Sequence, residues 1–349
     1  MRYSIVIPVY NRPDEADELL ESLCRQTLTD FEVVIVEDGS SVPCKDVVEK
    51  YGDRLNIRYL QKENGGPGLA RNYGVKHAAG EYVLILDSDC VLPEGYVAAV
   101  EEELQRERCD AFGGPDAANE SFTPVQKAIN YSMTSFFTTG GIRGGKKKMD
   151  KFYPRSFNMG IRREVYDELG GFSKMRFGED IDFSYRIVEA GYSCRLFPEA
   201  WVWHKRRTDF DKFFKQVFNS GIARINLEKR HPGTMKLVHM LPMVFTVGVL
   251  ALIMLYLCGL GLFMFAPDHM SKAFGFMLCE LAVIPIFLYT LLIFTDASVK
   301  NRSILIGYYA VIAAFVQLMG YGFGFLKAWW LRCVLGQDEF TAFEKNFYD

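Results

Sequence analysis

Apolar residues are distributed along this chain in two different ways, and the change comes close to Lys236. Before it, short apolar runs alternate with segments dense in charge, which is typical of a folded domain of strands and helices. From Leu237 onward, long stretches carry almost no charged residue. We therefore predict two domains, a globular one at 1–230 and a membrane domain at 231–349.

Four apolar runs in the first part are short and rich in β-branched or aromatic residues, which predicts buried strands. They begin at Tyr3, Phe31, Leu55 and Tyr82 and read YSIVIPVY, FEVVIVED, LNIRYL and YVLILD. Apolar residues have helical spacing in PDEADELLESLC, after the first run, and GPGLARNYGVKHAAG is predicted to be a loop that leads into a helix. Strand–helix–strand units at this spacing predict an α/β fold with a mainly parallel sheet.

Polar residues gather at the carboxyl ends of these strands, where α/β sheets bind their ligands. Three of the four predicted strands end in such residues. These are Pro8, Tyr10 and Asn11 after the first strand, Asp38 after the second, and Asp87, Ser88 and Asp89 after the fourth. Because these ends meet at one edge of a parallel sheet, the residues are candidates for a single site.

Asp87 and Asp89 form a D-x-D pattern. Side chains alternate along an extended strand, so the two carboxylates share one face while Ser88 points away. Neighbouring carboxylates repel each other unless a positive group lies between them. A hard cation, Mg²⁺ or Mn²⁺, that bridges to a substrate diphosphate would supply this charge. A turn capped by the two aspartates is the structural alternative.

Five further residues each admit a functional and a structural interpretation. Asp38 could accept a hydrogen bond from a nucleobase or form an Asx turn with the glycine that follows. Arg71 could neutralise a phosphate or lie on the surface. Glu179 and Asp180 open a predicted amphipathic helix, where acids stabilise the helix dipole and one of them could act as a base. His204 is a candidate third metal ligand or a structural histidine.

Three stretches of the second part, 237–265, 273–294 and 304–326, are long and apolar enough to span a hydrocarbon core about 30 Å thick. Helices of a soluble bundle would show a polar face, which these largely lack. The first apolar run is too short for a signal peptide, and a basic linker precedes the first stretch, so we expect a cytoplasmic globular domain. Lys327 and Arg332, just after the third stretch, conflict with a third crossing that ends outside.

Composition narrows the range of partners. The formal net charge of −3 gives no basic excess of the kind that nucleic-acid binding requires. None of the eight cysteines forms a C-x-x-C pair, so we expect reduced thiols and no zinc site. The segment 119–153 ends in five cations between Arg143 and Lys151, which favours a mobile loop near phosphates or a solvated surface loop. The aromatic face of DFDKFFKQVFNSG is expected to lie on a membrane surface or to pack on the domain.

The chain resembles the family 2 glycosyltransferases, in a membrane-anchored bacterial form with the GT-A nucleotide-diphospho-sugar transferase fold. The resemblance extends over about Tyr3 to Gly221. It rests on five motifs that occur in order: SIVIPVYNRP, FEVVIVEDGS, GLARNYGVKHAAGEYVLILDSD, NMGIRREVYDELGGF and GEDIDFSYR.

The resemblance implies transfer of a sugar from a nucleotide-diphosphate donor to a hydroxyl acceptor, usually with inversion and with a divalent metal. It implies that Asp180 is the general base and that Glu179 supports it or contacts the acceptor. The nucleotide-sugar site would comprise Pro8, Tyr10, Asn11, Asp38, Arg71, Asp87 and Ser88. The metal ligands would be Asp89, Asp87 and His204.

The sequence departs from the processive polysaccharide synthases of this superfamily, because KQVFNSGIAR stands where their QxxRW motif is expected. We therefore expect transfer of a single sugar to a lipid-linked or membrane-proximal glycan at the cytoplasmic membrane, in cell-envelope polysaccharide biosynthesis. The alternatives are a processive synthase, a nucleotidyltransferase, and an inactive membrane-anchored scaffold that binds nucleotide sugars. A nucleotidyltransferase would have a glycine-rich phosphate loop after the first strand, and a scaffold would have lost Asp89 or Asp180.

Overall fold

The computed structural model describes residues 1–117, 122–139, 152–175, 177–205 and 207–339. Contacts within the chain divide it into two compact units, which we describe separately. The first unit comes mainly from 1–120 and 147–205, and the second from 121–146 and 206–342. The five cations of the segment 119–153 lie outside the described residues.

The first unit is built on a seven-stranded sheet with the strand order β3-β2-β1-β4-β8-β6-β9. Its strands are β1 (Tyr3–Val9), β2 (Phe31–Asp38), β3 (Ile57–Lys62), β4 (Tyr82–Leu86), β6 (Ala111–Gly113), β8 (Asn158–Arg162) and β9 (Cys194–Leu196). The first four are parallel to one another, whereas β8 is antiparallel to both β4 and β6. The prediction of a mainly parallel sheet is therefore confirmed.

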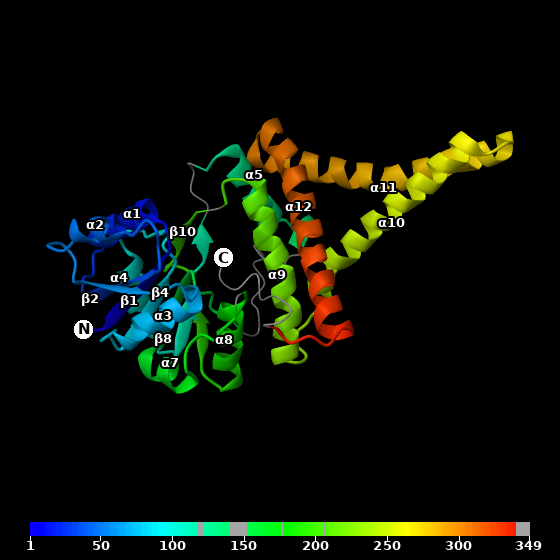
Figure 1. The fold of residues 1–349 in the computed structure, drawn as a ribbon. Helices are drawn as coiled ribbons and strands as arrows, with labels where there is room; N and C mark the ends of the chain where they lie inside the picture. The colour runs from blue at the N-terminus through cyan, green and yellow to red at the C-terminus, as the bar shows by residue number, and fades with distance from the viewer. Residues whose placement is uncertain (118–121, 140–151, 176, 206, 340–349) are drawn as a thin grey trace. The chain divides into compact units, whose positions relative to one another are not determined.

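Helices cover both faces of this sheet (Figure 1). They are α1 (Pro13–Cys24), α2 (Lys45–Glu49), α3 (Pro67–Lys76), α4 (Tyr96–Arg106), α7 (Arg163–Leu169) and α8 (Glu179–Glu189). Alternation along β1 divides its side chains between two cores. Ile5 and Ile7 pack with residues of α1 and α4, and Val6 packs with residues of α3, α7 and α8.

A small second sheet adjoins the end of β4. It has the strand order β5-β10-β7, with β5 (Cys90–Val91), β7 (Asp116–Ala117) and β10 (Val202–His204). The pairing of β10 with β5 is antiparallel and places His204 opposite Cys90. This pairing brings the histidine next to the D-x-D segment, which lies between β4 and β5.

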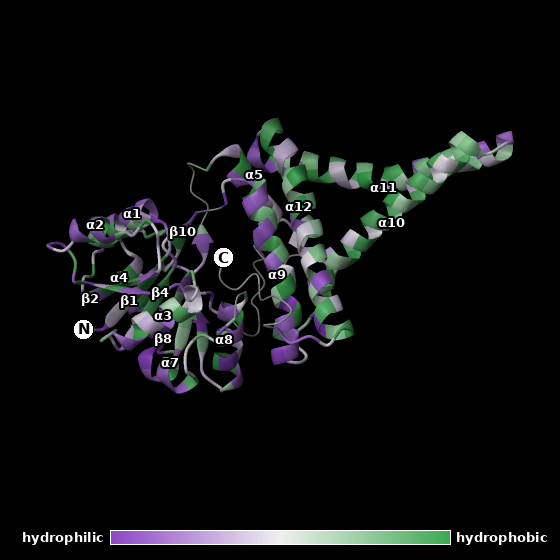
Figure 2. Ribbon diagram, viewed as in Figure 1, coloured by the Kyte–Doolittle hydropathy of each residue, from purple (hydrophilic) through white to green (hydrophobic). Residues whose placement is uncertain are grey.

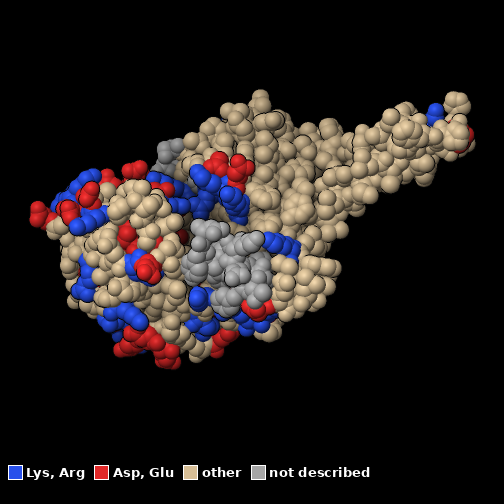
Figure 3. Space-filling model, in the orientation of Figure 1, with Lys and Arg blue, Asp and Glu red and all other residues tan. Residues whose placement is uncertain are grey.

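The second unit is helical. It contains α5 (Pro124–Thr134), α6 (Phe136–Thr139), α9 (Phe210–Arg230), α10 (Leu237–Phe265), α11 (His269–Asn301), α12 (Ile304–Trp329) and a π-helical turn (Trp330–Val334). Of the helices that the structure describes, α10, α11 and α12 with the π-helical turn that follows it are long and apolar enough to cross a membrane. In Figure 2 their ribbons are mainly green to white, the colours of hydrophobic and intermediate residues, and Figure 3 shows few charged side chains on the paired α10 and α11. The amphipathic helix α9 belongs to this unit.

Candidate active site

The D-x-D segment links the buried strand β4 to the short strand β5. Ser88 and Asp89 are buried, whereas the Asp87 side chain is about one-third exposed. The two carboxylates have different partners, because Asp87 binds an arginine of α3 and Asp89 binds the histidine of β10.

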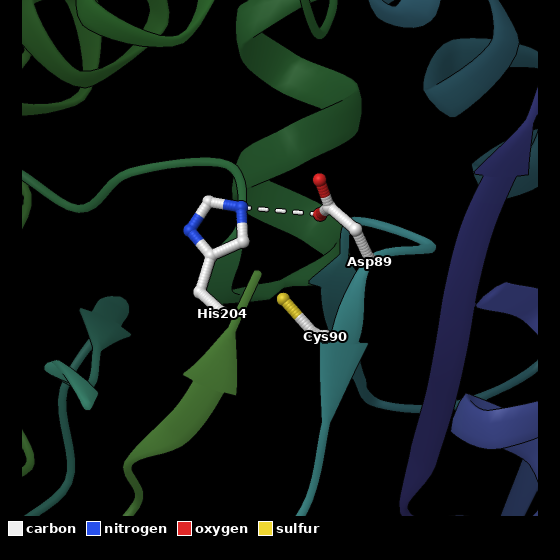
Figure 4. Close-up of side chains that lie close together, drawn as sticks. All are labelled: Asp89, Cys90 and His204. Atoms are coloured by element: carbon white, nitrogen blue, oxygen red, sulfur yellow. Dashed lines mark ion pairs between the residues drawn. The ribbon is translucent and has the colours of Figure 1, made fainter. Parts of the chain in front are cut away.

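Asp89 and His204 are in direct contact (Figure 4). The imidazole Nε2 lies 3.1 Å from Asp89 Oδ1, and the ring stacks on Phe157 at 5.0 Å between centroids. The other oxygen of Asp89 accepts a hydrogen bond from Arg12 at 3.2 Å. Ligand atoms of Asp89, Cys90 and His204 lie within 4.8 Å of one another.

This cluster fits a divalent cation through two of its three residues. A carboxylate oxygen and an imidazole nitrogen both suit Mn²⁺ or Mg²⁺, and the cation keeps further positions for substrate phosphates. The Cys90 thiol is a poor ligand for either cation, because a soft sulfur does not suit a hard divalent ion. Asp89 and His204 are therefore the residues that would hold the metal, and Asp87 is not in the cluster.

Arg71 connects two acidic groups that are distant in the sequence. From α3 it donates to Asp87 at 2.7 Å and to Glu179, at the start of α8, at 3.0 Å. Burial alone would lower the Arg71 pKa, but the two carboxylates outweigh this effect and raise it. The guanidinium also lies over the Phe172 ring. A permanent positive charge is thus fixed between the D-x-D segment and α8.

The adjacent acids Glu179 and Asp180 are held by different arginines. Asp180 Oδ2 accepts from Arg155 Nε at 2.7 Å, and Oδ1 accepts from the Ile181 amide at 2.9 Å. Burial opposes the charge on Asp180, but the charge and hydrogen bond of Arg155 prevail and lower its pKa. Burial, together with the neighbouring charge of Asp180, raises the pKa of Glu179 against the effect of Arg71. Asp180 is therefore the carboxylate of the pair that loses its proton more readily.

Asp38 closes a turn at the end of β2. Its Oδ1 accepts from Lys62 Nζ at 2.6 Å and from the Gly65 amide at 3.0 Å, and its Oδ2 accepts from the Gly66 amide at 2.9 Å. Gly66 has a φ of 85°, which only glycine adopts without strain, so the turn depends on this residue. The carboxylate thereby orders the loop that begins α3 and carries Arg71.

The end of β1 contributes an exposed aromatic ring and a constrained asparagine. Tyr10 is 46% exposed, and Pro8 is the second-last residue of β1, where it pairs with Val36 of β2. Asn11 has a positive φ of 53° and donates its backbone N–H to Ser40 Oγ at 2.7 Å. This conformation connects the ends of β1 and β2 beside the turn formed by Asp38.

Comparison with known proteins identifies the domain that carries these strand ends. The model of glycosyl transferase family 2 matches residues 4–170. This segment belongs to that family. It contains both aspartates of the D-x-D segment and Arg71, whereas Asp180 and His204 lie after it.

Relatives of this family 2 domain occur in several organisms. The uncharacterized glycosyltransferase EpsJ of Bacillus subtilis is 28% identical over 202 residues, which cover 56% of each chain. The poly(ribitol-phosphate) beta-N-acetylglucosaminyltransferase TarS of Staphylococcus aureus is 45% identical over 93 residues, 26% of this chain and 16% of TarS. The chain thus matches about half the length of the first relative and a smaller part of the second.

A solved structure supports the GT-A type of fold. The mannosyltransferase PcManGT from Pyrobaculum calidifontis, solved with GDP-Man and Mn²⁺, is similar with a TM-score of 0.58 and 16% identity. The similarity covers 95% of this chain and 88% of that one. The predicted fold class of the family 2 domain is therefore confirmed.

Sequence reasoning missed three residues that contact the predicted site. Arg12 binds Asp89, Arg155 binds Asp180, and Phe157 stacks on His204. Arg12 is part of the SIVIPVYNRP motif, so its position after the first strand was a usable signal. Arg155 and Phe157 precede β8 in a stretch without a recognisable pattern, and only the fold brings them to the site.

Proposed function

We propose that this protein transfers a single sugar from a nucleoside-diphosphate sugar to a hydroxyl group of an acceptor, with inversion at the anomeric carbon. The observation that carries the proposal is the arrangement around Arg71. This residue joins Asp87 of the D-x-D segment to Glu179, and Asp180 comes next on α8. Arg71 thereby offsets the repulsion between these carboxylates and keeps the base close to the diphosphate-binding edge.

The division of labour follows from the reaction. In a one-step displacement, the acceptor hydroxyl and the leaving diphosphate lie on opposite faces of the anomeric carbon, so a base and a positive charge are needed on opposite sides. Asp180 is the base, because Arg155 keeps its carboxylate unprotonated and so able to accept the proton of the acceptor hydroxyl. Its oxygens hold one hydrogen bond each in the contacts described, and each carboxylate oxygen has room for another.

Asp89 and His204 would hold the divalent cation. When bound, Mg²⁺ or Mn²⁺ would neutralise the charge that develops on the departing diphosphate. The Mn²⁺ named with the solved mannosyltransferase supports a divalent metal in this fold. Arg12 lies beside the same carboxylate and adds a permanent positive charge to this edge.

The donor would be bound at the strand ends. We assign the nucleotide to the edge formed by Pro8, Tyr10, Asn11 and Asp38, with Arg71, Asp87 and Ser88 toward the ribose and phosphates. The names of TarS and of the solved mannosyltransferase complex, which include an N-acetylglucosaminyl transfer and a GDP-sugar, support a nucleotide sugar as the donor.

The acceptor would be a lipid-linked or membrane-proximal glycan. The apolar helices of the second unit would anchor the protein to the cytoplasmic membrane, so the active site meets acceptors at its surface. The domain division that we expect, catalytic at 1–230 and membrane-bound at 231–349, belongs to this proposal.

The test is metal-dependent release of nucleoside diphosphate. The detergent-purified protein is incubated with Mg²⁺ or Mn²⁺ and a panel of UDP-, GDP- and dTDP-sugars, with and without membrane lipid extract as acceptor. We expect one donor to react, EDTA to stop the reaction, and Asp89→Asn to lower the rate by about 100-fold, the scale of a disturbed metal site. Asp53→Asn, at an exposed carboxylate, should keep the full rate. Absence of both release and calorimetric binding for every donor would overturn the proposal.

A further inference from the structure

The three apolar helices do not form a bundle of three parallel or antiparallel spans. The helices α10 and α11 pack against each other near the turn that joins them, away from α12. There Gly259 and Gly275 are so close that a Cβ on either would lie within 2.7 Å of the other's carbonyl oxygen. Figure 1 shows this pair extending away from α12, while α12 lies beside α9. The pair is a helical hairpin with a short turn between Phe265 and His269.

Both ends of α12 lie at the base of this hairpin. Near its start, Gly307 packs against Phe294 and Ser298, in the last turns of α11. Near its end, Gly322 packs against Pro242 and Thr246, in the first turns of α10. A third crossing would instead carry Gly322 toward the hairpin turn. The first turns of α10 and the last turns of α11 are on the same side, so α12 begins and ends there.

The middle of α12 also lies at the base. Phe315 is packed between Phe245 of α10 and Tyr289 of α11, at ring distances of 5.7 and 5.8 Å. From Phe245 to Phe265 the hairpin extends for roughly 30 Å at about 1.5 Å per residue. This length equals the thickness of a bilayer's hydrocarbon core, about 30 Å. The part of the hairpin beyond α12 is therefore sufficient to cross the membrane.

Charges on the neighbouring helix α9 give independent evidence. Phe210 contacts Tyr309 of α12, and Phe214 and Val217 contact Gly320. The charged residues between these contacts are therefore level with the middle of α12, and they are exposed: Asp211, Lys212 and Lys215. Charges at the centre of a bilayer are strongly unfavourable. A crossing α12 would carry these three charges into the hydrocarbon core.

We propose that α12 does not cross the membrane but lies along its surface with α9, and that α10 and α11 alone cross it as a hairpin. The exposed surface of α9 and α12 would contact the lipid headgroups of the leaflet on the side of the catalytic domain. The exposed aromatic residues near the ends of α12, Tyr308, Trp329 and Trp330, suit this region, because aromatic side chains concentrate there.

This topology removes the conflict in the distribution of basic residues. With two crossings, Lys300 and Arg302 at the end of α11 and Lys327 and Arg332 near the end of α12 all lie on the side of the basic linker that precedes α10. At the end of α11, Asp296 accepts a hydrogen bond from Tyr131 of α5 at 2.5 Å, as expected for a helix end outside the hydrocarbon core. Four basic residues then lie on the side of the catalytic domain, against Lys272 near the hairpin turn on the other side, in agreement with the positive-inside rule.

The test is the sidedness of single cysteines in sealed membranes. In a Cys258→Ser, Cys333→Ser background, three variants are labelled with a membrane-impermeant maleimide: Glu94→Cys in the catalytic domain, His269→Cys at the hairpin turn and Asp338→Cys after α12. We expect Asp338→Cys to gain label in vesicles of the same orientation as Glu94→Cys, and His269→Cys only in vesicles of the opposite orientation. Labelling after detergent solubilisation defines the maximum for each variant.

The outcome distinguishes two crossings from three. If Asp338→Cys gains label together with His269→Cys, α12 crosses the membrane and the proposal is wrong. A second reporter, Leu335→Cys, repeats the measurement in case Asp338 is shielded, and labelling of either reporter with the hairpin turn overturns the proposal. If only solubilisation exposes both reporters, α12 ends within the bilayer, which also contradicts a surface helix.

Discussion

Two neighbouring carboxylates at the start of α8 differ in their readiness to lose a proton. Asp180 is held by its own arginine, Arg155, so its pKa is lowered despite burial. Glu179 shares Arg71 with Asp87 and also faces the charge of Asp180, so its pKa is raised. Because their environments shift the two pKa values in opposite directions, the pair has the properties of a base and its support.

The first residue-scale prediction concerns the base. Asp180→Asn should lower kcat by about 10²- to 10⁴-fold, the usual contribution of a positioned base. Donor affinity should change little, because the amide has nearly the same size and still accepts a hydrogen bond. Steady-state kinetics and calorimetry with the donor measure the two effects. Glu189→Gln, at the exposed end of the same helix, is the matched control, and equal losses in both variants would refute the role of Asp180.

The second residue-scale prediction concerns pH. Arg155 lowers the Asp180 pKa, so Arg155→Gln should raise it, and the acid limb of the kcat/KM profile should move to higher pH. The sign follows because the base must be unprotonated, and a higher pKa protonates it at a higher pH. Arg54→Gln, which removes an exposed arginine paired with Glu21, should leave the profile unchanged. An unmoved acid limb in Arg155→Gln would mean that another group controls it.

At the scale of elements, α9 and α12 pack closely through glycines. A Cβ on Gly324 would lie 2.0 Å from the Phe218 carbonyl oxygen, and one on Gly221 would lie 2.1 Å from the Tyr321 carbonyl oxygen. Small residues allow the two backbones to approach each other and increase the contact area between the helices. The amphipathic helix is thereby fixed to the apolar one.

This packing predicts that Gly324→Ala destabilises the second unit. The added methyl meets backbone, which cannot move without separating the helices, and overpacking of this kind costs about 1–3 kcal/mol. We expect a lower thermal unfolding temperature in detergent, followed by intrinsic tryptophan fluorescence. Gly248→Ala in α10 is the matched control, because its Cβ would meet nothing within 4 Å. A similar fall in both variants would show that the glycines of these helices matter for another reason.

Short strands bring one of the metal-site residues into place. The pairing of β10 with β5 involves two residues of each strand, yet it carries His204 to Asp89. Strands of two or three residues have too little periodicity to be found in a sequence. The four longer patterns were predicted and are confirmed as β1 to β4, whereas the short strands β5, β6, β7, β9 and β10 and the five-residue strand β8 were not predicted.

The whole molecule combines a charged, water-facing unit with helices whose apolar side chains are exposed. Large residues along α10 and α11, among them Leu257, Phe265 and Phe287, are 53%, 81% and 60% exposed in the isolated chain. Apolar surface of this extent marks an interaction with a membrane or a partner. Together with the net charge of −3, it favours insertion into lipid over electrostatic adsorption to an anionic surface.

At this scale we predict an integral membrane protein. The chain should remain in the membrane pellet after washing with 1 M salt and with carbonate at pH 11, and detergent should release it. The physical reason is that buried apolar helices are insensitive to ionic strength and pH, whereas a surface-bound protein is released by screening. A peripheral protein of the same host, followed on the same blot, is the control. Release of this chain by salt alone would contradict the insertion of α10 and α11.

The sequence by itself determined the features that depend on residues close to one another in the chain. Apolar periodicity was sufficient for the parallel strands β1 to β4, the helices α1 and α3 and the three apolar helices, whereas α2 and α4 were not predicted. The D-x-D segment followed from its place at a strand end. Only the tertiary structure decided which distant groups meet: His204 with Asp89, Arg155 with Asp180, and both ends of α12 with the base of one hairpin. Such contacts depend on how complete elements pack against each other, and local periodicity carries no information about that packing.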